Sequence, residues 1–135
     1  MTTGCQTPAA PLIERVHRDH ALLRTLFDAL ALTRDARELR AALWDLYLTF
    51  NGHLDMEEMR IAPLLRAGPT PERANAMILE HNEQRRVLRE LIEDAERDAG
   101  TEAELRARAN DIVAALREDM AQEETSLSPT VLGAA

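Results

Sequence analysis

Apolar residues recur along most of the chain at steps of three and four positions, the spacing that gives an α-helix one apolar face. Breaks at 33–35, 67–71 and 98–101 divide this pattern into four segments of roughly 20 to 30 residues. Long helices joined by short loops pack antiparallel, so the pattern predicts an all-α, up-down-up-down four-helix bundle. Thr70 and Thr101 precede acidic residues and are predicted to cap the third and fourth helices.

The apolar face of each segment is predicted to form the core. The positions expected to face inward are Ile13, Val16, Leu23, Phe27 and Leu30 in the first segment, Leu39, Leu43, Leu46, Phe50 and Leu64 in the second, Met77, Leu88, Leu91 and Ala95 in the third, and Leu105, Ile112, Leu116 and Leu127 in the fourth. Aromatic residues make up only 3% of the chain, so this core is expected to be mostly aliphatic.

Some positions on these apolar faces carry ionisable side chains instead. They are His20, His53, Glu57, His81, Asp119 and Glu123. Burying an unpaired charge in an aliphatic core costs several kcal/mol, so a compensating partner is expected. Counted from the loops at about 1.5 Å per residue, the six positions lie at depths that agree to within one or two helical turns. Their side chains can therefore converge inside the bundle.

The two halves of the chain repeat the same order of ionisable residues. The matching pairs are Asp19 with Glu80, His20 with His81, His53 with Asp119, Glu57 with Glu123, and Glu58 with Glu124. Residues four apart share one face of a helix, so each half can present a pair of donors beside one histidine. Two such halves indicate a site for two metal ions.

The donor types limit the choice of metal. Imidazole nitrogen with carboxylate oxygen suits iron or manganese, whereas the single Cys5 cannot build a thiolate zinc site or an internal disulfide. Two divalent ions would be balanced by Glu57, Glu123, Asp119 and a bridging hydroxide. A carboxylate-rich set favours the ferric state, which disfavours reversible oxygen carriage.

The chain resembles the hemerythrin-like, or HHE cation-binding, domain family over about residues 11–129. The resemblance rests on Asp19-His20, HLDMEEMRIAP at 53–63, Glu80-His81 and DMAQEETSLSP at 119–129. It implies a non-haem di-iron centre with an oxo or hydroxo bridge, manganese being the alternative metal. The ligands that it implies are His20, His53, Glu57, His81 and Glu123, with both glutamates bridging. Members of the family are implicated in binding O2, in sensing oxygen or iron, in nitric-oxide or peroxide chemistry, and in repair of iron–sulfur clusters.

The chain departs from the family at one position. The fourth helix of the family carries His-x-x-x-Glu, and here Asp119 stands where the histidine would be. Asp119 is predicted to be the sixth metal ligand, the alternative being an acid outside the ligand set. Because aspartate is shorter than histidine and anionic, the second metal is expected to move toward the fourth helix, to bind Asp119 through a water, or to bind more weakly. His17, one turn before His20, is the other candidate nitrogen donor, although a surface position suits it better.

Two function classes stay open on the sequence alone. The first is a di-iron protein that binds O2, peroxide or NO, with peroxide or iron-redox activity favoured over a carrier. The second is a metal-free or single-metal helical interaction or sensor module with a vestigial site. The acids next to the ligand positions are expected to be mostly solvated, with some orienting histidines. These acids are Asp19, Glu58, Glu80 and Glu124.

The net charge of −8, from 16 basic and 24 acidic residues without a basic cluster, argues against nucleic acid as a partner. No stretch reaches about 18 uncharged apolar residues, and no signal peptide is recognisable, so a cytoplasmic protein without membrane contact is expected. A single domain over 1–135 is predicted, with flexible tails at 1–10 and 130–135. A homodimer is compatible with these features.

Overall fold

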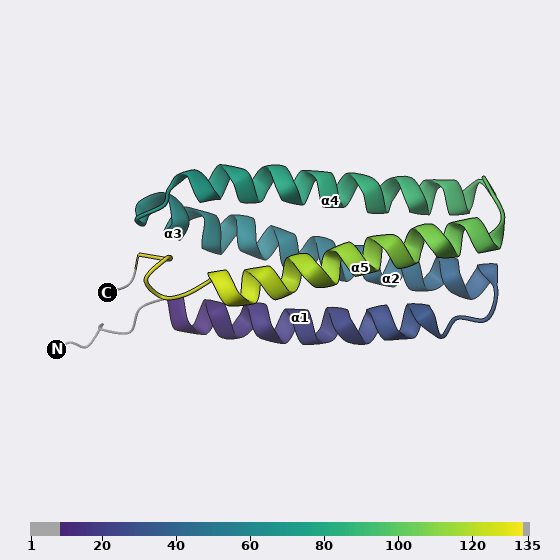
Figure 1. The fold of residues 1–135 in the computed structure, drawn as a ribbon, viewed down its shortest axis with the longest axis horizontal. Coiled ribbons are helices and arrows are strands. Elements are labelled where there is room, and N and C mark those ends of the chain that lie inside the picture. Colours follow the sequence, from purple (N-terminus) through teal and green to yellow (C-terminus); the bar gives the residue numbers. More distant parts are fainter. Residues whose placement is uncertain (1–8, 134–135) are drawn as a thin grey trace.

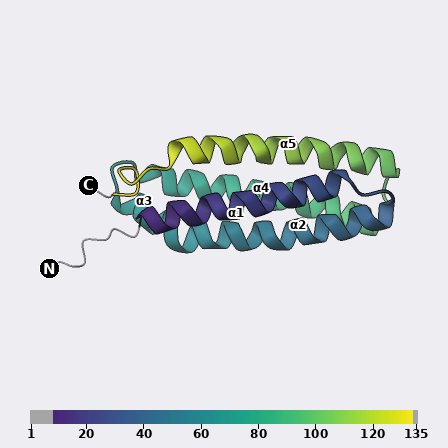
Figure 2. The same ribbon diagram turned by 90° about the horizontal axis from the view of Figure 1, so that it is seen from below.

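The computed structural model describes residues 9–133 as four antiparallel helical rods (Figure 1). The elements are α1 (Ala9–Ala31), α2 (Ala36–Met56), η2 (Glu57–Ile61), α3 (Ala62–Ala67), α4 (Glu72–Glu96) and α5 (Glu102–Ser126). The elements α2, η2 and α3 follow one another without a break and form the second rod. α1 packs between α2 and α5, and α4 also contacts both (Figure 2). The predicted all-α, up-down-up-down bundle is confirmed.

The helix starts follow from local hydrogen bonds. Asp35 accepts a 2.8 Å hydrogen bond from the backbone N–H of Glu38 at the start of α2. Thr101 and Glu104 form the reciprocal pair of hydrogen bonds of a capping box, which confirms the predicted cap of α5. The predicted Thr70 cap is wrong, because no side chain caps α4. Its first turn follows Pro71, whose fixed φ already suits a helix start.

Two apolar clusters fill the bundle. The larger lies toward the loops that join α1 to α2 and α4 to α5, and it includes Leu23 and Leu91. The smaller lies toward α3 and includes Leu12 and Leu65. Full burial of each large aliphatic side chain contributes about 1.5–3 kcal/mol, so the two clusters stabilise the bundle on either side of its polar middle. The buried histidines and Glu57 occupy that middle.

The core differs from the predicted one at four positions. Ile13 and Leu64 are only partly buried, while Leu12, Ile61 and Leu65 are buried. The change in the second rod follows from η2, a π-helical turn in which the Ala62 N–H donates to the Glu57 carbonyl five residues earlier. Such a turn is wider than an α-helical one, so the residues after it rotate relative to an uninterrupted helix. The other predicted core residues are buried, except Met77 and Ile112, which are partly buried.

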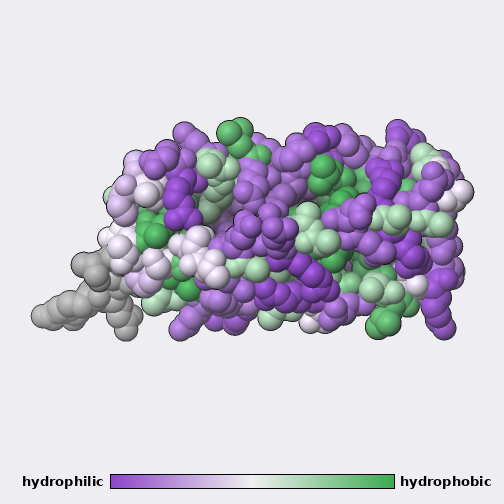
Figure 3. Space-filling model, viewed as in Figure 1, coloured by the Kyte–Doolittle hydropathy of each residue, from purple (hydrophilic) through white to green (hydrophobic). Residues whose placement is uncertain are grey.

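The ends of the described chain are packed. Residues 1–8 and 134–135, which include most of the predicted tails, lie outside the described residues. Within residues 9–133, α1 starts at Ala9, which is buried, and Leu132 packs in the smaller cluster. No helix in this range is long and apolar enough to cross a bilayer. The face in Figure 3 is mostly hydrophilic, with apolar surface in separate patches.

Candidate metal centre

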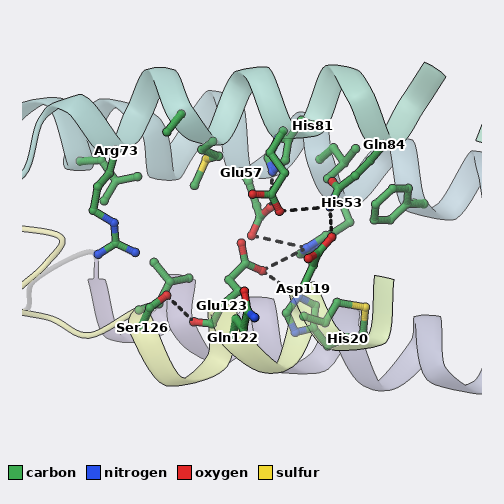
Figure 4. A pocket seen from close by; sticks show the side chains of 18 residues that line it. His20, His53, Glu57, Arg73, His81, Gln84, Asp119, Gln122, Glu123 and Ser126 are labelled. Atoms are coloured by element: carbon green, nitrogen blue, oxygen red, sulfur yellow. Dashed lines mark hydrogen bonds and ion pairs between the residues drawn. The ribbon is translucent and has the colours of Figure 1, made fainter. Parts of the chain in front are cut away.

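Four rods bring a set of nitrogen and oxygen donors together in the middle of the bundle (Figure 4). One donor atom each from His20 of α1, His53 of α2, Glu57 of η2 and Glu123 of α5 lie within 4.8 Å of one another. The His20 Nε2 is 2.8 Å from Glu123 Oε1, and the His53 Nε2 is 3.8 Å from the same oxygen. Glu123 therefore faces both imidazoles.

The carboxylate of Glu57 lies between the imidazoles of His53 and His81. Its Oε2 is 3.4 Å from His53 Nε2, and its Oε1 is 3.1 Å from His81 Nε2 of α4. The Glu57 side chain is only 1% exposed. The two predicted bridging glutamates thus each face a pair of Nε2 atoms.

Each of the three imidazoles is held from behind by a carboxylate of another rod. Nδ1 of His20 is 2.7 Å from Glu124, Nδ1 of His53 is 2.9 Å from Asp19, and Nδ1 of His81 is 2.9 Å from Glu58. A carboxylate can only accept, so Nδ1 carries a proton and Nε2 is the nitrogen that faces the centre. The expectation that these acids are mostly solvated is therefore wrong for these three.

Arginines fix two of these carboxylates. Arg24 donates to Glu124 Oε2 at 2.9 Å, and Arg85 donates to Glu58 Oε2 at 2.7 Å. Burial alone would raise the pKa of each glutamate, but the arginine and the histidine that it meets lower the pKa overall. Both acids therefore stay ionised and hold the imidazole rings in orientation.

Glu57, His20 and His53 favour the protonated state as long as no cation is present. Burial, followed by the neighbouring Glu123, raises the pKa of Glu57 to about 10. Burial alone would lower the pKa values of His20 and His53, but the carboxylates of Glu123 and of the outer acids raise them. Burial alone would raise the pKa of Glu123, whereas the neighbouring His20, His53 and Glu57 lower it. Glu123 is thus the negative charge that the other three groups face.

Two buried atoms of this set have no partner in hydrogen-bond geometry within the part of the chain that the structure describes. They are Glu57 Oε2 and His20 Nε2, although His20 Nε2 lies 2.8 Å from Glu123 Oε1. Such atoms are uncommon in protein interiors, since leaving a buried polar group unpaired costs about 1–3 kcal/mol. A cation between the Nε2 atoms and the carboxylates would satisfy both of them and replace the protons.

Asp119 lies beside this set but has a different partner. Its half-buried carboxylate accepts a 3.0 Å hydrogen bond from Gln84 Nε2 of α4. Gln84 also donates to Glu80 at 3.3 Å, and within residues 9–133 Glu80 makes no hydrogen bond to a histidine Nδ1. Burial and then the Asp119 charge raise the pKa of Glu80. His17 is exposed and does not line the cavity, in agreement with a surface role.

A cavity of about 300 Å³ opens onto the centre. All six predicted site residues line it, together with apolar side chains of both clusters. Arg73, Gln122 and Ser126 lie on one side of the centre (Figure 4), and Arg73 is the single arginine in the lining. The cavity has room for a small molecule next to the donors.

The structure adds features that the sequence interpretation missed. The π-helical turn was not predicted, although the two adjacent acids Glu57 and Glu58 mark its first residues. Gln84 also lines the cavity and donates to Asp119. The cross-rod pairing of acids and histidines follows from the repeat, because in each half an acid next to one site residue reaches the neighbouring rod.

Comparison with known proteins identifies one family. The family model for the hemerythrin HHE cation binding domain matches residues 12–131, which is most of the chain. No match was found among curated proteins or among solved structures.

Proposed function

The chain belongs to the hemerythrin HHE cation-binding family, and from this membership we propose that its central cluster binds two iron ions and presents them to O2, peroxide or NO. A cation-binding role is the part that the family supports directly. We propose in addition that there are two ions, that they are iron, and that they bind O2, peroxide or NO. The observation that carries it is the convergence of three Nε2 atoms on the buried Glu57 and the partly buried Glu123, with each Nδ1 held by a carboxylate of another rod.

The donor set fits iron. Imidazole and carboxylate donors without thiolates are those of non-haem iron and manganese sites in helical bundles. His20 and His53 with Glu123 would hold one ion, and His81 with Glu57 and Asp119 would hold the other. The buried His20 Nε2 and Glu57 Oε2, which have no partner in hydrogen-bond geometry, fit a cation better than they fit an apolar core.

The protein's own residues would prepare the site. Asp19, Glu58 and Glu124 fix which nitrogen of each imidazole faces inward, so the donors are in place before a cation binds. The apolar clusters above and below keep bulk water out, which strengthens the electrostatic interactions inside. Arg73 places a positive charge on the cavity through which a small ligand would enter.

Bound iron would supply an open coordination position and one-electron redox chemistry. The centre has more carboxylates than a set with four histidines would have, and anionic oxygen donors stabilise the higher oxidation state. We therefore favour peroxide or iron-redox chemistry over reversible oxygen carriage for this chain.

Metal analysis of protein produced with added iron tests the proposal. We expect two irons per chain and a near-ultraviolet charge-transfer band, with both lost in His53→Ala. The exposed His17→Ala is the matched control and should retain the metal. Wild-type protein without bound metal after anaerobic loading would refute the proposal and support the metal-free helical module.

A further inference from the structure

Aromatic residues of the chain stand at a constant spacing on one helix. Trp44, Tyr47 and Phe50 of α2 are three residues apart, and one more step of three reaches His53 of the metal centre. Residues three apart are neighbours on the surface of a helix. At about 1.5 Å per residue, Trp44 and His53 lie about 14 Å apart along the helix axis. The three aromatic side chains therefore form a row on α2 that ends at His53.

Burial increases along this row. Trp44 is 42% exposed, Tyr47 is partly buried, and Phe50 is 2% exposed. His53 is buried, and it lines the cavity of the centre together with Phe50. Each step of three residues also turns the side chain by about 60° around the helix axis, because a full turn takes 3.6 residues. The row thus winds from the outer face of α2 to the face that holds the centre.

The two outer rings of the row form an aromatic pair. The ring centroids of Trp44 and Tyr47 are 5.9 Å apart, and the ring planes meet at 83°, which is an edge-to-face arrangement. Both rings line an open groove of about 390 Å³ between α2 and α4. Small molecules in solution can therefore reach the outer end of the row.

The indole nitrogen of Trp44 has a proton acceptor. Its Nε1 donates a 2.7 Å hydrogen bond to Oε1 of Glu96, which lies on α4 and lines the same groove. An indole N–H can only donate, and its proton becomes acidic once the ring has lost an electron. The Glu96 carboxylate can therefore take this proton when Trp44 is oxidised and return it when Trp44 is reduced.

We propose that Trp44 and Tyr47 are the outer end of an electron path that runs along α2 to His53 and supplies electrons when the centre reduces peroxide. The inference rests on the proposed function, because it concerns the same centre. Indole and phenol rings can each give up one electron, and the chain has one tryptophan and one tyrosine, both in this row. Phe50 is not oxidised, and its apolar ring separates Tyr47 from the centre.

The electrons and protons of this step balance. Peroxide takes up two electrons and two protons when its O–O bond breaks and two waters form. When one ferrous ion is available, that ion gives one electron and becomes ferric, and Trp44 gives the other electron through Tyr47. The two protons for the waters come from solvent, while the indole proton moves to Glu96 and leaves a neutral Trp44 radical. A one-electron reductant of the ascorbate type in the groove restores Trp44, and Glu96 returns the proton.

Freeze-quench electron paramagnetic resonance tests this inference. Iron-loaded protein with part of its iron oxidised is mixed with hydrogen peroxide in the absence of oxygen and frozen at once. We expect the signal of an organic radical. Because the chain has a single tryptophan, wild-type protein grown with ring-deuterated tryptophan assigns the radical without any substitution. The hyperfine splitting of the signal should narrow with this label.

Variants of the row test its parts. Trp44→Phe should abolish the tryptophan radical and retain the iron content of the wild type, and Tyr47→Phe should lower the yield of the radical. Glu96→Gln keeps an acceptor oxygen but cannot take the proton, so the yield should fall about tenfold or more. The matched control is Glu93→Gln, because Glu93 is exposed in the same groove and Trp44 donates to Glu96 instead. Melting temperatures verify that each variant folds.

The failures of the two proposals look different. Wild-type protein that holds two irons and consumes peroxide without an organic radical, or with a radical that the tryptophan label does not narrow, would overturn the electron path and leave the proposed function intact. Equal radical yields in Glu96→Gln and Glu93→Gln would overturn the role of Glu96 as proton acceptor. Wild-type protein that binds no iron would overturn both proposals.

Discussion

Replacing Glu57 by glutamine should stabilise the metal-free protein and abolish its metal binding. Glu57 is the most buried carboxylate of the centre, at 1% exposure, and its pKa is raised to about 10 by burial and by the neighbouring Glu123. Glutamine has the shape of the protonated acid and can donate to Glu123 in the same way. The change therefore removes an ionisable group from a place that disfavours its charge.

The size of the effect follows from the pKa difference. Below the ordinary pKa of 4.5, Glu57 is protonated in the folded and unfolded states and costs no stability. As the pH rises above 4.5, the unfolded chain loses this proton while the folded chain keeps it, so the metal-free protein loses about 1.4 kcal/mol per pH unit. At about pH 7.5 the cost reaches about 4 kcal/mol, and at about pH 5 it is below about 1 kcal/mol.

Urea unfolding of the metal-free proteins at both pH values measures the prediction. Glu57→Gln should gain stability at the higher pH and very little at the lower one. The neighbouring Glu58→Gln is the control with the opposite sign. The pKa of Glu58 is lowered overall by Arg85 and His81 against the effect of burial, so this variant should lose stability at the higher pH. A gain in Glu57→Gln that is absent, or equal at both pH values, would refute the reasoning. When iron is added, wild-type protein should be stabilised and Glu57→Gln should not, because this variant no longer binds the metal.

Three further changes test the supports of the centre and the packing. Glu124→Gln should weaken iron binding about 10- to 100-fold, because it loosens the His20 imidazole that Glu124 holds. The control is Glu118→Gln, an exposed position on the same helix, and this variant should bind iron like wild type in an iron titration. Leu23→Ala should lower the free energy of unfolding by about 2–5 kcal/mol, because it leaves a cavity in the larger cluster. Gly68→Ala should lower the free energy of unfolding by about 1–3 kcal/mol, because the new Cβ would lie 2.8 Å from a backbone oxygen of the C-terminal segment. Gly52 lies in a helix with open space around it, so Gly52→Ala should raise the free energy of unfolding by about 1 kcal/mol in the same assay.

The bundle could be predicted because its signal is long and regular. Each segment repeats the three-and-four spacing over several turns, and the short breaks between segments allow only antiparallel neighbours. In the second rod, the misplaced residues lie where a local event changes the spacing. The π-helical turn at Glu57–Ile61 places Ile61 and Leu65 in the core in place of Leu64. The spacing of apolar residues before this turn does not indicate the change.

The candidate site could be predicted only in part, for a related reason. Its inner residues interrupt an apolar pattern, so each one is visible on its own helix. The outer acids do not interrupt any pattern, because Asp19, Glu58 and Glu124 stand on the polar side of their own rods. Their partners are histidines of other rods. A contact between two rods depends on how each rod is rotated about its own axis, and the sequence pattern of one segment does not give that rotation relative to its neighbour. Once the acid–histidine pairs are known for one half of the chain, the internal repeat predicts the corresponding pairs in the other half.

The placement of the centre between two apolar clusters explains how the bundle can hold it. A buried Glu57 that costs about 4 kcal/mol is offset by the burial of two or three aliphatic side chains at about 1.5–3 kcal/mol each, and the clusters contain many more. The donors can therefore stand in position without a cation, unlike those of small domains that fold only on binding metal. It follows that iron should raise the melting temperature of an already folded protein, and that the helical circular dichroism of the metal-free chain should equal that of the loaded one. A metal-free chain that lacks this helical signal would show that the cation, and not the clusters, holds the rods together.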